Sequence, residues 1–177
     1  MRNMFKWSED WQMLFHLEKC QANHIGRKNH NAKYEMGGKE LIEVKEEKDL
    51  GVIVSSDLKV GKQCAIAGKK GNQILGMIAR TFENRSKEII LQLFKSLIRP
   101  HLDYCIQAWR PHLVKDIEVL EKVQWRATRM IWDCKGMSYC DGLKKLNITT
   151  LETRRIRADL LAVLEVKIMK GLELFKR

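Results

Sequence analysis

The chain has 177 residues, 45% of them hydrophobic, enough to bury a core as one domain or as a small domain plus part of another. Its net charge of +11 arises after residue 60: residues 1–60 hold ten Lys and Arg against ten Asp and Glu, residues 61–132 hold thirteen against six, and residues 133–177 hold ten against six. Five cysteines without a Cys-x-x-Cys pair, and no apolar run of membrane-spanning length or signal-peptide core, argue against a disulfide framework, a membrane protein and a secreted protein. We therefore expect a soluble, intracellular protein.

The charge asymmetry bears on the kind of partner. A basic segment of this size favours a partner that carries phosphates, because each Lys or Arg that neutralises a phosphate releases condensed counterions. A well-solvated helical surface explains the charge equally well, since charge alone reports solubility and non-specific association.

The first sixty residues have a mixed α/β pattern. Residues 4–19 space their aromatic side chains so that a short helix would bury several of them, and residues 20–26 are typical of a short strand. Gly37 and Gly38 separate two short apolar stretches, as in the turn of a hairpin. Residues 50–54 are the most strand-like segment, because they are rich in β-branched side chains.

Helical spacing begins after Leu58 and continues to Phe82. Apolar side chains fall on one face of this segment, and Lys69, Lys70 and Arg80 fall largely on the other. Its three glycines, at positions 68, 71 and 76, each weaken an isolated helix by up to about 1 kcal/mol relative to alanine. We expect them to serve close packing against another helix.

Two amphipathic helices are predicted between residues 86 and 132. Ser86 is a suitable N-cap for the first, which should kink or stop before Pro100. The apolar face continues through Leu102, Cys105 and Trp109, and a second helix begins at about Asp116. A short helix is possible at residues 140–145, and residues 151–175 form a last helix with apolar positions at Ile156, Leu160, Val163, Leu164 and Ile168.

Seven blocks of the sequence stand in a distinctive order: Trp7-x3-Trp11-Gln12-Met13-x-Phe15, Lys19-Cys20, His24-Ile25-Gly26, residues 46–55, residues 95–105, residues 120–124 and residues 126–131. Taken in this order, they resemble part of the reverse transcriptase, an RNA-directed DNA polymerase, of non-LTR (LINE-type) retrotransposons, particularly the chicken-repeat-like lineage of vertebrates. The resemblance spans nearly the whole chain, although each block alone is weakly specific.

The resemblance implies a polymerase register. Residues 1–60 would be a remnant of the palm, with Lys19 as a relic of the palm lysine and Leu50 and Gly51 in the primer-grip region. Residues 61–177 would be the helical thumb that holds the template–primer duplex. The expected fold is therefore α+β and mostly α, a small mixed palm remnant followed by a helical bundle.

The chain departs from the family in one feature that decides activity. Phosphoryl transfer in polymerases needs paired carboxylates that hold two metal ions, and this sequence contains no adjacent Asp-Asp pair. The family's aromatic-Ala-Asp-Asp box would lie upstream of residue 1, so we expect a truncated fragment without polymerase activity of its own. Mg²⁺ would be a cofactor only of an intact parent enzyme, and we expect no cofactor here.

The resemblance and the charge pattern point to a nucleic-acid partner, an RNA–DNA hybrid or duplex bound through its backbone. For any single cation, a solvated surface role is about as well supported as a phosphate contact. Trp125 falls among polar positions and is a candidate for stacking on a base, whereas Trp109 lies on an apolar face and is expected in the core. The candidate binding residues are Lys69, Lys70, Arg80, Lys95, Arg99, Arg110, Trp125, Arg126 and Arg129.

Other chemistries have weaker support. Without metals and a nucleotide pocket Lys19 is better explained as a solvated lysine at a helix end, and Gly51 as a turn glycine. Cys20-x3-His24 with nearby His30 invites a zinc site, but the remaining cysteines lack finger spacing, so we expect no metal. Two other functions stay open: a non-enzymatic helical protein-interaction module, and a translated relic without a role.

Overall fold

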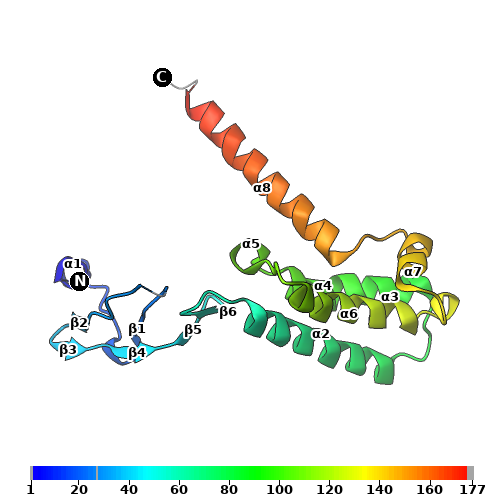
Figure 1. Cartoon of the computed structure of the whole chain (residues 1–177), viewed down its shortest axis with the longest axis horizontal. Coiled ribbons are helices and arrows are strands. Elements are labelled where there is room, and N and C mark those ends of the chain that lie inside the picture. Colours follow the sequence, from blue (N-terminus) through cyan, green and yellow to red (C-terminus); the bar gives the residue numbers. More distant parts are fainter. Residues whose placement is uncertain (1, 27, 175–177) are drawn as a thin grey trace. The chain divides into compact units, whose positions relative to one another are not determined.

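The computed structural model describes residues 2–26 and 28–174, and it divides into two compact units, Met1–Val60 and Gly61–Arg177. The boundary falls where the sequence changes from near neutral to basic. Within the described residues the chain is mostly helical, with three small two-stranded sheets in the first unit (Figure 1). The predicted fold class, α+β and mostly α, is confirmed.

Among residues 2–26 and 28–60, the first unit contains one helix, one helical turn and six short strands. β1 and β4 pair in parallel, β2 and β3 form a hairpin, and β5 and β6 form a second hairpin. The elements are α1 (Arg2–Asp10), η1 (Leu17–Lys19), β1 (Gln21–Asn23), β2 (Glu35–Met36), β3 (Lys39–Glu40), β4 (Ile42–Val44), β5 (Glu46–Asp49) and β6 (Val52–Ser55).

A small apolar cluster holds the first unit together. Ala22, Met36 and Leu41 are buried. Phe5, in α1, and Phe15, in the segment that follows α1, pack against them. The helix predicted over residues 4–19 is wrong in its length, because α1 ends at Asp10 and a second helical turn begins only at Leu17. The aromatic side chains of the intervening region are therefore divided between this core and the surface.

The turns of both hairpins use left-handed backbone. Gly37 and Gly38 have φ of +58° and +77° and join β2 to β3, which confirms the predicted turn. Leu50 and Gly51 have φ of +44° and +86° and join β5 to β6. The strand predicted over residues 50–54 therefore begins two residues later, at Val52.

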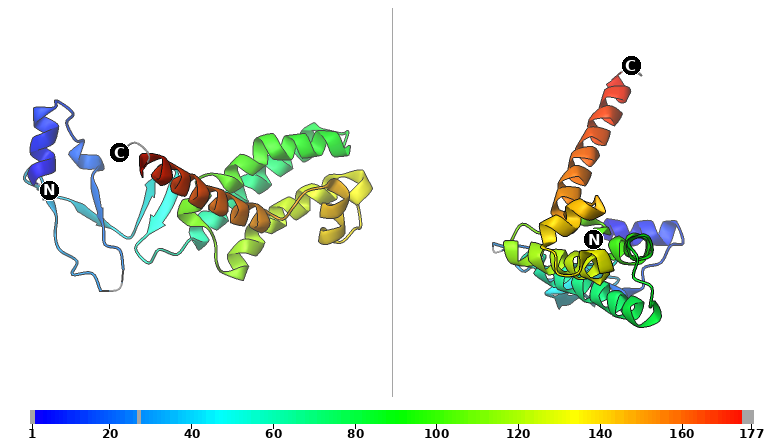
Figure 2. Two further views of the ribbon diagram at one scale, coloured as in Figure 1. Left: turned by 90° about the horizontal axis from the view of Figure 1, so that it is seen from above. Right: turned by 90° about the vertical axis from the view of Figure 1, so that its right-hand side faces the viewer.

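The second unit is a helical bundle followed by a long helix. Its elements are α2 (Gly61–Thr81), α3 (Lys87–Leu93), the π-helical turn η2 (Phe94–Ile98), α4 (Arg99–Asp103), α5 (Ile106–Trp109), α6 (Val114–Met130), η3 (Trp132–Cys134), α7 (Tyr139–Leu146) and α8 (Leu151–Leu174). Figure 2 shows α2 and α6 side by side, with the α3–α4 segment packed along them.

Two glycines let α2 and α6 approach closely. A Cβ atom on Gly68 would lie 2.9 Å from Cγ1 of Val119, and one on Gly71 would lie 2.9 Å from Cγ1 of Val123. The predicted role in helix packing is therefore confirmed for these two positions. It is wrong for Gly76, where only the Arg80 guanidinium lies within 4 Å of an added Cβ, at 3.8 Å.

The helix that begins after Ser86 does not stop before Pro100. It widens into the π-helical turn η2 over Phe94–Ile98 and then continues as α4, with Pro100 in its first turn. A π-helical turn shifts the hydrogen-bond pattern by one residue, and the first turn of a helix leaves amide positions without an intrahelical acceptor. The missing N–H of Pro100 is tolerated at this position. The predicted disturbance is therefore present before Pro100, as the π-helical turn, but the helix does not end there.

The core of the bundle agrees with most of the predicted apolar positions. Leu102, Trp109 and Leu120 are at most 1% exposed, and the indole N–H of Trp109 donates to the Tyr104 carbonyl oxygen at 2.7 Å. Cys105 is an exception, because it is exposed at a left-handed position (φ +50°) between α4 and α5. The short helix predicted at residues 140–145 is α7.

The last helix leaves its apolar positions in solvent. α8 points away from the other helices of its unit in Figure 1, and the predicted apolar positions Ile156, Leu160, Val163, Leu164 and Ile168 are all 41% exposed or more. The predicted helix is present from Leu151, although its predicted last residue, Phe175, lies outside the described residues. Within the described part of the chain, none of the helices combines the length and hydrophobicity needed to cross a lipid bilayer.

Two glycine substitutions test the close contact of α2 and α6. Gly71→Ala should lower the free energy of unfolding by about 1–2 kcal/mol, because overpacking against the stiff Val123 side chain outweighs the gain in helix propensity. Gly76→Ala, in open space on the same helix, should raise it by up to about 1 kcal/mol. Urea denaturation of the full chain measures both values, and equal stabilities of the two variants would contradict the packing.

Candidate nucleic-acid interface

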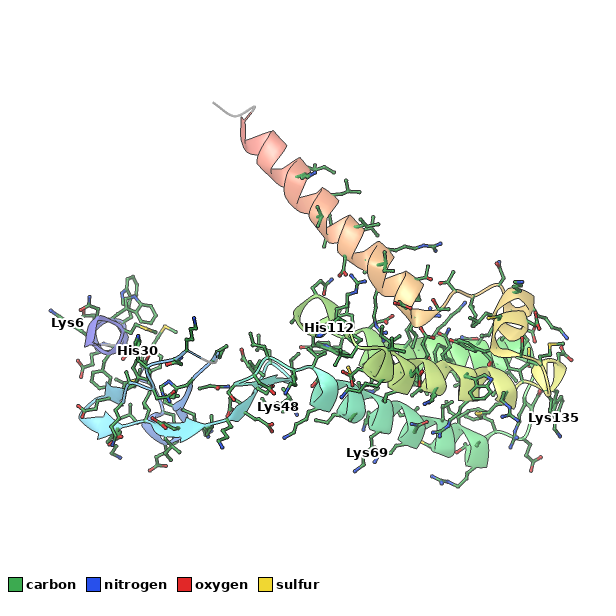
Figure 3. All side chains as sticks on the ribbon, viewed as in Figure 1. Lys6, His30, Lys48, Lys69, His112 and Lys135 are labelled. Carbon is green, nitrogen blue, oxygen red and sulfur yellow. The ribbon has the colours of Figure 1, made fainter. Side chains whose placement is uncertain are left out.

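One exposed stripe of α2 carries cations at a helical repeat. Lys62, Lys69, Gln73 and Arg80 are separated by seven, four and seven residues, a spacing that keeps them on one side of an α-helix, and all four are exposed. α2 contains no Asp or Glu in its 21 residues. Figure 3 shows Lys69 pointing away from the helices that pack on α2. The stripe is therefore positive along its whole length.

A second stripe follows the exposed side of α6. Lys115, Lys122, Arg126 and Arg129 recur at seven, four and three residues and are exposed. One acidic side chain lies among them: the Glu118 carboxylate accepts a hydrogen bond from Lys122 Nζ at 3.1 Å. This exposed i,i+4 pair neutralises one cation of the stripe and leaves the positive charge of the others.

α2 and α6 run side by side in the same direction, which places the two stripes on neighbouring helices. Arg126 Nη1 donates to Asn72 Oδ1 at 2.7 Å, and this bond joins the exposed edges of the two helices. It lies further along both helices than the contact between Gly68 and Val119. We call the combined surface the two-helix basic face. It consists of Lys62, Lys69, Arg80, Lys115, Lys122, Arg126 and Arg129.

Some predicted binding residues lie elsewhere in the second unit. Lys70 is one residue beyond Lys69 and therefore about 100° further round α2. Lys95 lies on η2, where it lines an open hollow of about 560 Å³ with residues of α3. Arg110 Nη1 donates to Asp159 Oδ2 at 2.6 Å, an ion pair that links α5 to α8.

Arg99 is engaged inside the bundle. Its guanidinium lies 5.5 Å from the centre of the Phe94 ring, and burial followed by the charge of Arg154 lowers its pKa. Asp103 balances this cluster, because its Oδ2 accepts from the Arg154 guanidinium at 3.2 Å. Arg155, the next residue of α8, is 2% exposed, and burial lowers its pKa too. These arginines contribute to packing rather than to the two-helix basic face.

Trp125 lies at the edge of the two-helix basic face. Its indole is 38% exposed, and the guanidinium of Arg129 lies 5.4 Å from the ring centre. Such an arrangement stabilises the ring and the cation in a fixed orientation. Trp125, Arg126 and Arg129 thus share one surface with Lys69 and Arg80.

The residues that the resemblance assigns to the palm lie in the first unit. Lys19 is an exposed residue at the end of η1, and Leu50 and Gly51 form the exposed turn between β5 and β6. The structure leaves their predicted roles as predictions.

The residues considered for zinc have other contacts. His24 Nε2 lies 3.2 Å from Glu43 Oε1 and its ring stacks on Tyr34, and the Cys20 thiol lies 3.5 Å from the His16 carbonyl oxygen. His30 is exposed in the loop after residue 26. Among residues 2–26 and 28–174, no three His, Cys, Asp or Glu side chains gather in a way that could hold a metal ion.

Sequence reasoning missed the polar contacts that shape this surface. Asn72 was assigned no role, although it joins the two helices through Arg126. The contact of Tyr139 with α6 was missed as well: its hydroxyl donates to the Glu121 carboxylate and accepts from Gln124 Nε2. Lys115 and Lys122 were not among the candidate binding residues, although their helical spacing from Arg126 was a signal that could have added them.

Comparisons with known protein families, with characterised proteins and with solved structures found no match to this chain.

The buried thiol of Cys64 makes stability depend on pH. Burial, followed by the nearby charge of Asp116, raises its pKa to about 11, and the side chain is fully buried on the α2 side of the bundle. Because the unfolded chain loses this proton first, at about pH 9, the free energy of unfolding should fall by roughly 1–3 kcal/mol between pH 9 and pH 11.

Urea denaturation at pH 8, 9, 10 and 11 measures this dependence. Cys64→Ala should be less stable at pH 8 but should flatten the fall between pH 9 and 10. The slope that remains above pH 10 should come largely from Tyr139, whose pKa is raised by burial and by Glu121. A Cys64→Ala profile with the wild-type slope would contradict the assignment.

Proposed function

We propose that the two-helix basic face binds the sugar–phosphate backbone of a nucleic-acid duplex. The observation that carries this proposal is the alignment of exposed cations on neighbouring faces of α2 and α6, with Glu118 as the acidic side chain among them. Exposed like charges at this density repel one another, and a polyanion relieves that repulsion while releasing its own counterions. Backbone contacts of this kind position a duplex without reading its sequence.

The resemblance to non-LTR reverse transcriptases supports a hybrid of RNA and DNA as the duplex. In that interpretation residues 61–177 act as the thumb of such a polymerase, and residues 1–60 derive from its palm. Polymerisation would need the metal-binding carboxylates of a longer parent chain, with Mg²⁺, since the sequence contains no Asp-Asp pair. The proposed activity of this chain alone is binding, in a cellular compartment that we do not assign.

The exposed apolar side chains of α8 favour a second candidate function, a helical protein-interaction module. Leu160, Leu161 and Leu164 are 53–60% exposed on a helix that leaves the rest of its unit. A helix with apolar side chains in solvent is suited to a hydrophobic groove of another protein. Binding through α8 would depend weakly on salt, whereas binding of phosphates weakens steeply as salt rises.

Fluorescence anisotropy of a labelled RNA–DNA hybrid, titrated with the full chain at 50–300 mM salt, tests the first proposal. Lys69→Gln/Arg126→Gln should weaken binding and reduce the slope of log affinity against log salt by about 2, because two phosphate contacts are lost. The matched control Lys28→Gln/Lys39→Gln removes the same charge from exposed positions of the first unit and should keep the wild-type slope.

Two results would contradict the proposal. One is the absence of binding at about 50 mM salt by a wild-type sample whose cooperative unfolding shows that it is folded. The other is an equal effect of the two double substitutions, which would mean that net charge, and not the two-helix basic face, controls binding.

A further inference from the structure

A small hollow borders the two-helix basic face between α6 and α7. It has a volume of about 180 Å³ and is lined by Glu118, Glu121, Lys122, Trp125 and Tyr139. Its exposed wall is apolar, although three of the five side chains are charged, because the aromatic rings and the aliphatic parts of the other residues face it. Drug-sized ligands occupy pockets of roughly 300–1,000 Å³, so this hollow suits a single small planar group.

Hydrogen bonds hold the inner wall of the hollow in place. The Tyr139 hydroxyl donates to Glu121 Oε2 and accepts from Gln124 Nε2 at 3.1 Å. Gln124 is fully buried and also donates to the Thr149 carbonyl oxygen at 2.9 Å, while Glu121 Oε1 accepts from the Glu152 amide at 2.8 Å. The phenol ring is therefore fixed from α6 and from the start of α8, which gives the hollow one firmly held wall.

The indole of Trp125 forms one wall of the hollow, next to Lys122 of the two-helix basic face. Side chains on an α-helix lean toward its N-terminus, so Trp125 leans over Glu121 and Lys122, and Arg129 in turn covers Trp125. The hollow lies on the N-terminal side of the indole, and the Arg129 cation lies on its C-terminal side. The ring thus keeps surface available for stacking while one side is held by the cation.

The charges around the hollow select its occupant. A phosphate in this apolar hollow would lose its hydration and lie near the negative charges of Glu118 and Glu121, whereas an uncharged ring would contact two aromatic walls. Lys122 lines the hollow and the Arg129 guanidinium lies on its Trp125 wall, so two cations of the two-helix basic face border it. Stacking of a base on an aromatic side chain contributes about 1–3 kcal/mol and tolerates any base.

We propose that this hollow receives one unpaired nucleobase of a nucleic acid whose backbone lies on the two-helix basic face. The inference rests on the proposed function, because the backbone contacts bring the base to the hollow. It adds a preference to that function: a duplex that contains an unpaired nucleotide binds more tightly than a fully paired duplex of the same length.

The test compares two labelled RNA–DNA hybrids that differ by one bulged 2-aminopurine nucleotide. The wild-type chain should bind the bulged hybrid about tenfold more tightly, and the fluorescence of 2-aminopurine should fall on binding as the base stacks. Trp125→Ala should abolish both the preference for the bulged hybrid and the quenching. The matched control Trp132→Ala removes a tryptophan that is 62% exposed and should retain both effects.

The outcomes separate the two proposals. Equal affinity of the wild-type chain for the two hybrids, without quenching, overturns the base site and leaves duplex binding intact. A preference that survives in folded Trp125→Ala also overturns it. Failure of the folded wild-type chain to bind either hybrid at about 50 mM salt overturns the proposed function and the base site together. The quenching measurement needs no variant, so it remains decisive if Trp125→Ala does not fold.

Discussion

The approach of α2 to α6 at Gly68 and Gly71 is the contact on which the arrangement of the second unit depends. Each glycine leaves a space that a valine of α6 fills, and any larger residue at these positions would push the helices apart. Ile98 and Leu102 reach the same space from the α3–α4 segment, 3.5 Å from where a Cβ of Gly71 would lie. The contact at these small residues therefore sets how closely α2, α6 and the α3–α4 segment approach one another.

This contact also sets the electrostatics of the surface. Because α2 and α6 run in the same direction, their N-terminal ends lie together and their dipoles add instead of cancelling. The buried carboxylate of Asp116 lies in the first turn of α6. It is in contact with the position that a Cβ atom on Gly61, the first residue of α2, would occupy. A negative charge is favourable at a helix N-terminus, so Asp116 stabilises the parallel arrangement. The same arrangement places two rows of cations on one surface, at a cost in repulsion that a polyanionic partner would relieve.

The spacing of apolar residues in the sequence predicted the structure well wherever burial follows the helical repeat. The positions of α2, α6 and α7, and the burial of Leu102, Trp109 and Leu120, follow from apolar residues three and four apart. Pattern failed where a neighbouring element decides the outcome. β5 is a fully exposed strand of Glu46–Asp49, a sequence with low strand propensity, and it exists because its backbone pairs with β6. The apolar positions of α8 share the spacing of core residues but have no helix to cover them among the described residues of the unit.

The same distinction applies to the candidate site. Its cations could be identified from the sequence, because charge and helical spacing are local properties, and the resemblance to reverse transcriptases named the partner to expect. Only the tertiary structure separated Lys69, Arg80, Arg126 and Arg129, which share a surface, from Arg99 and Arg110, which pair or pack within the bundle. The hollow beside Trp125 needs Tyr139 from another helix, held by residues 15–18 positions away. By itself the sequence determined the positions of α2, α6 and α7, the basic character of the second unit and the absence of an Asp-Asp pair. The tertiary structure decided which charges act together, because side chains from separate helices meet only when packing has set the helices in register.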